Sequence, residues 1–255
     1  MKIIAIAPCW NEALLLPFYL RHYERFCDHI VVYDNESSDG SMDILLAHPK
    51  VELRKLQTGN EYDENSIIAL KTAAYQEQRG KADWVIVGDV DELLWHRDMA
   101  SFLAGCKGRG ENLIRTEAYE MVSETSPNSD RQIWEQITQG IPNPRYSKRC
   151  CFAPDLNVVW ALGCHSASVT PAPRESGQVL PLLHFKFVGR EYAKARYAAL
   201  DARRSKAMRD SALGIHWAVG PGGVDRQFDL LLAQAKELSF LANPPQSSSP
   251  PSAAP

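Results

Sequence analysis

The sequence lacks the charge excess that marks many nucleic-acid-binding proteins. Its 28 lysine and arginine residues face 31 aspartate and glutamate residues, which gives a formal net charge of −3. A protein that binds nucleic acid usually has a strongly basic surface, and this composition has no overall excess of positive charge. We therefore expect no nucleic-acid partner.

Paired cysteine motifs are also missing. The six cysteines include no CxxC pair and no spacing typical of a secreted disulfide scaffold. Cys150 and Cys151 are adjacent, so in a strand they would face opposite sides and could not readily bridge each other. The pattern predicts buried thiols in a reducing compartment and gives no reason to expect zinc.

Long apolar runs are absent too. The first run, MKIIAIAP, is too short for a signal-peptide core or a membrane span, and the next, ALLLPFYL, is short and contains a proline. We expect a cytoplasmic protein without a transmembrane segment, either free or peripheral at the inner face of the membrane.

Alternating strand-like and helix-like segments are what the sequence does contain. Strands are predicted at residues 2–7, 29–33, 51–56 and 84–87, with helices at residues 13–26, 41–46 and 65–78. Such alternation predicts an α/β fold with a mixed, mainly parallel sheet flanked by helices. In these sheets ligands bind at the carboxyl ends of the strands.

The alternation weakens after residue 95. Strands are predicted at residues 112–122, 149–153, 157–161 and 179–187, and helices at 189–208 and 225–241. We expect one domain over residues 1–242, with a nucleotide-binding half (1–95) and an acceptor and metal half (96–242). Residues 243–255 have almost nothing to bury, which predicts a disordered tail.

An acidic triplet follows the apolar strand WVIV. In a β conformation Asp89 and Asp91 would point the same way. Two converging carboxylates favour Mg²⁺ or Mn²⁺, and such an ion would also neutralise the phosphate oxygens of a nucleotide. A solvated loop is the alternative interpretation.

Two other predicted strands also end in polar residues. Asn11 and Glu12 follow the first strand, and the segment from Asp34 to Asp39 follows the second. The coincidence of three polar strand ends favours a ligand site, although the second segment must also form a turn and a helix cap.

Further candidates lie in the second half. His184 and Lys186 share a strand face, where imidazole could bind a metal and the ammonium could stabilise a leaving diphosphate. A core histidine and a lysine reaching solvent are the alternatives. Glu117 or Glu120 could act as a general base, whereas exposed strand glutamates are the structural alternative. Arg196 and Arg203, seven residues apart on a predicted helix, could approach phosphates.

The ordered set of motifs resembles an inverting family 2-type glycosyltransferase of the GT-A fold, and most nearly the subgroup that is similar to DUF23/family 92 enzymes. The motifs are CWNEALLLPFYLRHYERF, HIVVYDNESSDGSMDIL and ADWVIVGDVDELLW, followed by EAYEMVSE, RYSKRCCF, GCHSA and LLHFKFVGREYAKARY. The resemblance covers about residues 2–217.

The resemblance implies a sugar donor activated by UDP, GDP or dTDP, a glycan or lipid-linked hydroxyl acceptor, and a divalent cation, Mn²⁺ or Mg²⁺. It implies metal binding by Asp89 and Asp91, with His165 and His184 near the diphosphate and the metal. The residues that it assigns to the nucleotide pocket are Pro8, Asn11, Glu12, Asp34, Asp39 and Asp89. The family usually takes its catalytic base from an acidic ED motif, and this sequence has no clear ED motif. Glu117 and Glu120 are therefore the candidates for the base.

Two other functions are compatible with the predicted fold. A sugar nucleotidyltransferase would share the fold, but it usually has a glycine-rich basic loop after the first strand, and the loop PCWNE has neither glycine nor a cation. A non-catalytic nucleotide- or carbohydrate-binding module would tolerate loss of the acidic triplet, which is intact.

Overall fold

A computed structural model describes residues 1–242, so the predicted tail at 243–255 lies outside the described residues. The strands are β1 (Ile3–Cys9), β2 (His29–Asp34), β3 (Val51–Lys55), β4 (Trp84–Val87), β5 (Glu92–Leu94), β6 (Leu113–Ser123), β7 (Gln139–Pro142), β8 (Cys151–Phe152), β9 (Asn157–Trp160), β10 (Ala167–Thr170), β11 (Glu175–Val188) and β12 (Lys236–Glu237). The α-helices are α1 (Leu16–Tyr23), α2 (Ser41–Ala47), α3 (Glu64–Gln76), α4 (Met99–Gly108), α5 (Arg190–Arg203), α6 (Lys206–Asp210) and α7 (Gly220–Gln234).

A mixed sheet forms the centre of the molecule, in the order β12-β7-β6-β8-β4-β1-β2-β3. Strands β4, β1, β2 and β3 run parallel, as the alternation of the first 95 residues predicts, whereas β8 and β7 are antiparallel to their neighbours. Strand β11 pairs parallel with β6 and antiparallel with β5. The predicted α/β class is confirmed.

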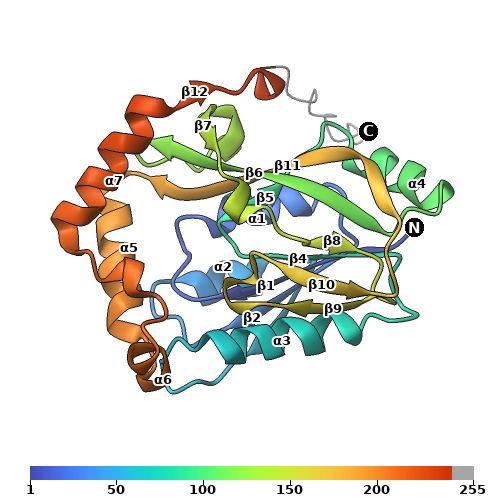
Figure 1. The fold of residues 1–255 in the computed structure, drawn as a ribbon, viewed down its shortest axis with the longest axis horizontal. Helices are drawn as coiled ribbons and strands as arrows, with labels where there is room; N and C mark the ends of the chain where they lie inside the picture. The colour runs from blue at the N-terminus through green and yellow to red at the C-terminus, as the bar shows by residue number, and fades with distance from the viewer. Residues whose placement is uncertain (243–255) are drawn as a thin grey trace, which may run out of the picture.

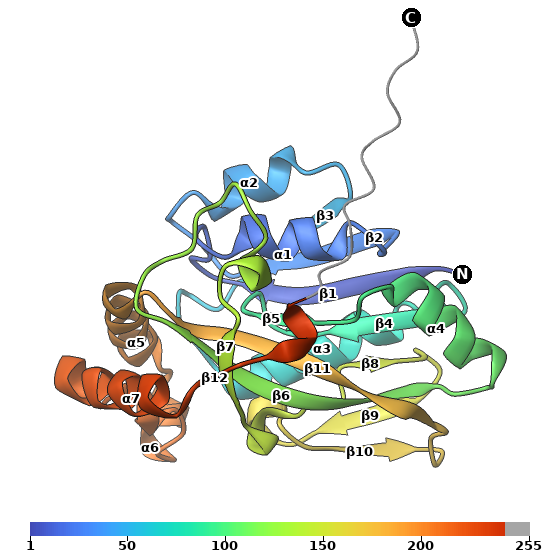
Figure 2. The same ribbon diagram turned by 90° about the horizontal axis from the view of Figure 1, so that it is seen from above.

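The two faces of the sheet are covered by different layers. Ile3 and Ala5 of β1 pack on one face with α1, α2 and α4, while Ile4 and Ile6 pack on the other with α3 and the β9–β10 pair. Figure 2 shows α1 and α2 on one side of β1 and the β9–β10 pair on the other. Because successive strand residues face opposite ways, apolar residues at every position of β1 are needed to fill both layers.

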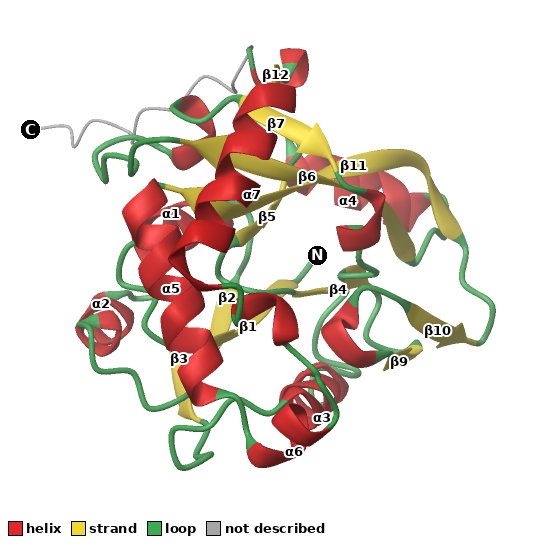
Figure 3. Cartoon of the chain, turned by 60° about the vertical axis from the view of Figure 1, so that its left-hand side comes forward, coloured by secondary structure: helices red, strands yellow, loops and turns green. Residues whose placement is uncertain are grey.

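The carboxyl-terminal helices form a separate layer beside the sheet. Helices α5 and α7 pack against each other, and Phe187 and Val122 of β11 and β6 pack against them through Tyr197 and Phe228. Figure 1 shows α5, α6 and α7 stacked at the left end of the molecule, and Figure 3 shows α5 and α7 side by side. This layer closes one side of the candidate site.

The helices of the second half differ from their predicted bounds. The single helix predicted at 189–208 is divided, because Arg204 has an extended backbone (ψ 127°) and the side chain of Ser205 accepts from Met208 N to begin α6. The last helix occupies Gly220–Gln234 rather than 225–241, with Pro221 in its first turn. Helix α4 was not predicted, although Asp98 caps it by accepting from Ser101 N.

Candidate functional site

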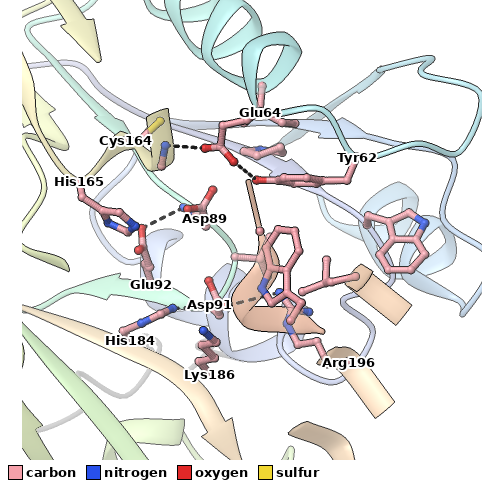
Figure 4. A pocket seen from close by; sticks show the side chains of 18 of the residues that line it. Tyr62, Glu64, Asp89, Asp91, Glu92, Cys164, His165, His184, Lys186 and Arg196 are labelled. Carbon is pink, nitrogen blue, oxygen red and sulfur yellow. Dashed lines mark hydrogen bonds and ion pairs between the residues drawn. The ribbon is translucent and has the colours of Figure 1, made fainter. Parts of the chain in front are cut away.

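A cavity of about 450 Å³ opens at the carboxyl ends of β1, β2 and β4. Its volume is in the range of small-molecule sites. Its wall includes the loop after β1, the acidic turn after β4, residues of β11 and one side of α5, together with the first turns of α3 and the segments 162–165 and 213–217. The predicted site residues that line it are Pro8, Glu12, Asp89, Asp91, His165, His184 and Lys186. Figure 4 shows several of these side chains facing one another.

The acidic triplet is a turn and not a continuation of the strand. Strand β4 ends at Val87, and Glu92 N donates to Asp89 O at 3.1 Å to close the turn before β5. The prediction that Asp89 and Asp91 point the same way in a β conformation is therefore wrong. The turn directs the two carboxylates to different partners.

Asp89 is held by two lysines that sequence reasoning missed. Lys71 Nζ donates to Asp89 Oδ1 at 2.7 Å, and Lys148 Nζ donates to Asp89 Oδ2 at 2.8 Å. Lys148 also contacts Glu92 Oε1 at 2.7 Å. Burial alone would raise the pKa of Asp89, but the charges of Lys148 and Lys71 lower it far below its usual value. This carboxylate is ionised and fully engaged.

A signal for one of these lysines exists in the sequence. Lys71 shares the buried side of α3 with Ile67, Ala74 and Tyr75, at the helical spacings of three and four residues. A single lysine within such an apolar stripe requires a buried anionic partner. No comparable pattern surrounds Lys148, because it lies in a loop.

Asp91 faces a histidine and an arginine instead. Its Oδ2 lies 3.5 Å from His184 Nε2 and 3.5 Å from Arg196 Nη2. His184 Nδ1 is 3.1 Å from Glu120 Oε1, as an ion pair rather than an aligned hydrogen bond. Sheet register explains the meeting, because His184 of β11 is paired with Glu120 of β6 on one side and Glu92 of β5 on the other.

The two flanking carboxylates determine the charge of His184. Burial would lower its pKa, but Glu120 and Asp91 raise it to about 10. The imidazole is therefore cationic near neutral pH. A divalent cation arriving at Nε2 would displace that proton.

Lys186 and Arg196 add positive charge to the same wall. Lys186 makes no ion pair with any carboxylate of residues 1–242, and its ammonium lies 4.8 Å from the centre of the Tyr197 ring. Burial lowers its pKa. Arg196 Nη2 bonds Glu12 Oε1 at 2.5 Å. A half-buried ammonium without a carboxylate partner is suited to an anionic ligand.

Glu12 carries an unused oxygen at this wall. Its Oε2 is buried and has no hydrogen-bond partner within the described residues. Burial raises the pKa of Glu12 to about 7, although Arg196 acts in the opposite direction. A carboxyl group with a free oxygen and a pKa near neutrality is suited to accept a proton.

Three of the residues assigned to the nucleotide pocket lie outside the cavity lining. Asn11 Oδ1 accepts from Ser38 N at 2.7 Å, and Asp39 Oδ2 accepts from Ala13 N at 2.9 Å. Asp34 Oδ2 accepts from Ser37 N at 3.2 Å. The first two contacts fasten the loop after β1 to the loop after β2, and the third closes the loop after β2 on itself. Together they position the cavity wall. A role in nucleotide binding stays a prediction.

The two predicted bases occupy different surroundings. Glu117 is exposed and accepts from Tyr119 Oη at 2.7 Å, whereas Glu120 is buried behind His184. Neither side chain lines the cavity. Glu120 can therefore act only through His184.

Asp91 and His184 have the donor chemistry for Mn²⁺ or Mg²⁺, and Glu120 stands behind Nδ1 of the imidazole, where metal-bound histidines usually have a carboxylate. Asp89 does not fit, because both of its oxygens accept from lysine. His165 is exposed and packs edge-on against Tyr146. Across residues 1–242, no three His, Cys, Asp or Glu side chains are grouped to hold a metal ion. The pair could supply only part of a coordination shell.

No model of a known protein family matches the sequence. No curated protein matches it either. Among the helices of residues 1–242, none is long and apolar enough to cross a bilayer.

Solved structures of similar fold are distant. S. aureus TarS is 12% identical with a TM-score of 0.46, covering 78% of this chain and 38% of its own. TarS 1–349 in complex with UDP is 14% identical, covers 84% of this chain and 70% of its own, and has a TM-score of 0.46. The 4-diphosphocytidyl-2C-methyl-D-erythritol synthase from Anaerococcus prevotii is 14% identical, covers 60% and 70%, and has a TM-score of 0.34. Similarity at this level does not identify an activity.

Proposed function

We propose that the protein is a glycosyltransferase of the GT-A type, related to family 2, which transfers a sugar from a nucleotide-sugar to a hydroxyl acceptor with inversion. The donor is a UDP-, GDP- or dTDP-sugar, and the acceptor is a glycan or a lipid-linked glycan. The sequence motifs support the family, and the cavity supports the chemistry.

One arrangement carries the proposal: Asp91 and His184 lie beside Lys186 and Arg196 at the carboxyl ends of the parallel strands. A nucleotide-sugar brings a diphosphate with two negative charges. The wall that faces it combines a carboxylate–imidazole pair with two cationic side chains, which matches a diphosphate that leaves with increased charge.

Asp91 and His184 would hold a divalent cation, which would supply positive charge to stabilise a departing diphosphate. Lys186 would contact the same oxygens directly, since its ammonium has no carboxylate partner among the described residues. Glu120, 3.1 Å from His184 Nδ1, would orient the imidazole and favour the tautomer that leaves Nε2 free for a metal.

Inversion also requires a group that takes the proton of the acceptor hydroxyl. Glu12 lines the cavity, has a free oxygen and has a pKa of about 7, so we assign it this role. Glu117 has no part in this mechanism, because its side chain is exposed outside the cavity.

The test is a calorimetric titration of the wild-type protein with UDP, GDP, dTDP and CMP, each with and without Mn²⁺, followed by donor hydrolysis assays. We expect Mn²⁺-dependent binding of at least one nucleoside diphosphate and release of that diphosphate from its sugar conjugate. Asp91→Asn should lose both, while Arg209→Met, an exposed change outside the cavity, should keep both.

A nucleotidyltransferase would give a different result. It would form a nucleotide-sugar and pyrophosphate from a nucleoside triphosphate and a sugar 1-phosphate. Release of pyrophosphate in that assay, without hydrolysis of any nucleotide-sugar, would replace the proposed reaction. Absence of nucleotide binding under all conditions would reject both enzymatic functions.

A further inference from the structure

Arg203, the last residue of α5, is a buried arginine with a free donor. The side chain is only 6% exposed. Its Nε donates to Asn60 O at 2.9 Å, and its Nη2 donates to Asn35 Oδ1 at 2.7 Å. Its Nη1 is buried and has no acceptor anywhere in residues 1–242. Leaving a charged donor without an acceptor is costly, so this atom marks a place where a ligand acceptor belongs.

The surroundings of Arg203 form one end of the cavity. Trp10, Asn35, Tyr62 and Arg203 all line it. The guanidinium carbon lies 3.8 Å from the centre of the Trp10 ring, which is a stacked cation–π contact. No carboxylate of the described residues pairs with Arg203, and burial lowers its pKa to about 10. The free Nη1 donor therefore requires a neutral or anionic acceptor in the cavity.

Backbone contacts keep this end rigid. Tyr62 N donates to Arg203 O at 2.7 Å, and Ser205 N donates to Tyr62 O at 3.0 Å. Asn35 is fixed in turn, because its Nδ2 donates to Leu56 O and to Thr58 Oγ1. These contacts fix the direction of the free N–H donor of Arg203 before a ligand binds. A donor with a fixed direction can select between ligands that differ in the matching group.

Helix α5 connects this end to the diphosphate end. Arg196 and Arg203 are seven residues apart, so they lie on the same side of the helix about 10 Å from each other along its axis. Arg196 contacts Asp91 and Glu12, whereas Arg203 contacts Asn35 and Trp10. A nucleoside diphosphate likewise carries its base and its diphosphate at opposite ends.

We propose that Arg203 Nη1 donates a hydrogen bond to a carbonyl oxygen of the nucleobase and so selects a base with a carbonyl at that edge, uracil rather than cytosine. The proposal rests on the proposed function, since it assumes that a nucleotide occupies the cavity. Uracil and cytosine have the same shape, but uracil carries a carbonyl at C4 where cytosine carries an amino group. An amino group would place a donor against the donor of Arg203 and leave both unpaired.

The experiment compares UDP with CDP in calorimetric titrations at saturating Mn²⁺. We expect wild-type protein to bind UDP about tenfold or more tightly than CDP, because one charged hydrogen bond is gained or lost. In Arg203→Met the two dissociation constants should agree within about twofold. Arg209→Met, an exposed arginine on the neighbouring helix α6, should keep the wild-type ratio.

A second variant separates base reading from a structural role. Arg203→Lys keeps the charge but not the planar fork, so it cannot hold Asn35 and a base carbonyl together. If the melting curve shows that Arg203→Met does not fold, the ratio of the UDP and CDP dissociation constants in Arg203→Lys provides the test. A purely structural arginine would weaken UDP and CDP equally in either variant and preserve their ratio.

The outcomes distinguish this inference from the function beneath it. Loss of the preference in the folded variants supports base reading by Arg203. A wild-type protein that binds both nucleotides equally, or a ratio that survives in both variants, overturns the inference and leaves the proposed function intact. A wild-type protein that binds GDP or dTDP but neither UDP nor CDP overturns the inference alone, whereas a wild-type protein that binds none of these nucleotides overturns the proposed function.

Discussion

His184 Nε2 lies 3.5 Å from Asp91 Oδ2, although strand β11 and the turn after β4 are far apart in the sequence. Arg196 Nη2 lies 3.5 Å from the same oxygen. Both atoms face the same space, and Glu120 lies behind the imidazole. This pair is the part of the acidic site that can receive a cation.

We expect Asp91→Asn to reduce turnover by about 100-fold or more, because a catalytic cation contributes several kcal/mol to the transition state. Mn²⁺ binding, measured by calorimetry, should fall in parallel. The melting temperature shows whether the variant folds. Full turnover in a folded Asp91→Asn protein would remove the metal from the mechanism.

Glu120→Gln tests the residue behind His184. We expect Mn²⁺ affinity to fall by about 10- to 100-fold, which is the usual cost of losing a carboxylate that orients a metal-bound histidine. Glu117→Gln is the matched control, since Glu117 is exposed three residues away on the same strand. Equal effects of both changes, or none of either, would contradict the role given to Glu120.

Lys148→Met should destabilise the fold by about 3 kcal/mol, because it leaves Asp89 and the buried Glu92 without their shared cation. Lys107→Met removes an exposed lysine that pairs with Asp83, so its effect should stay within about 1 kcal/mol. Urea unfolding at neutral pH compares them. Similar midpoints for the two variants would show that the cluster around Asp89 is not a stabilising unit.

Glu12 should make stability depend on pH. The folded state raises its pKa from 4.5 to about 7, so the native protein binds more protons than the unfolded chain in that interval. The contribution of Glu12 to the free energy of unfolding is therefore largest below pH 4.5. This contribution is lost as the pH rises through about 7. The slope cannot exceed about 1.4 kcal/mol per pH unit.

The measurement is the difference in unfolding free energy between wild type and Glu12→Gln from pH 4.5 to 7. Subtracting the variant cancels the other carboxylates, and a flat difference would show that Glu12 is not perturbed. If Glu12 is also the base, wild-type turnover should rise through about pH 7 and Glu12→Gln should lose turnover while keeping nucleotide affinity. Unchanged turnover in that variant would return Glu12 to a binding role.

The sequence by itself determined the sheet and the edge at which the site lies. Apolar residues at every position of β1 and β4 require burial on both faces, and the polar residues that follow mark where those strands end. Both are local properties, readable from the spacing of neighbouring residues. Lys71, alone within the buried stripe of α3, was readable in the same way.

Only the tertiary structure decided which charges meet. Lys148 lies 59 residues from Asp89, and no periodicity links them. His184 reaches Asp91 and Glu120 because β11 inserts between β5 and β6, a register set by the packing of the whole sheet. The sequence placed both aspartates on one strand face, yet the chain turns after Val87 and separates them. Charge pairing depends on distance in space, which local spacing does not specify.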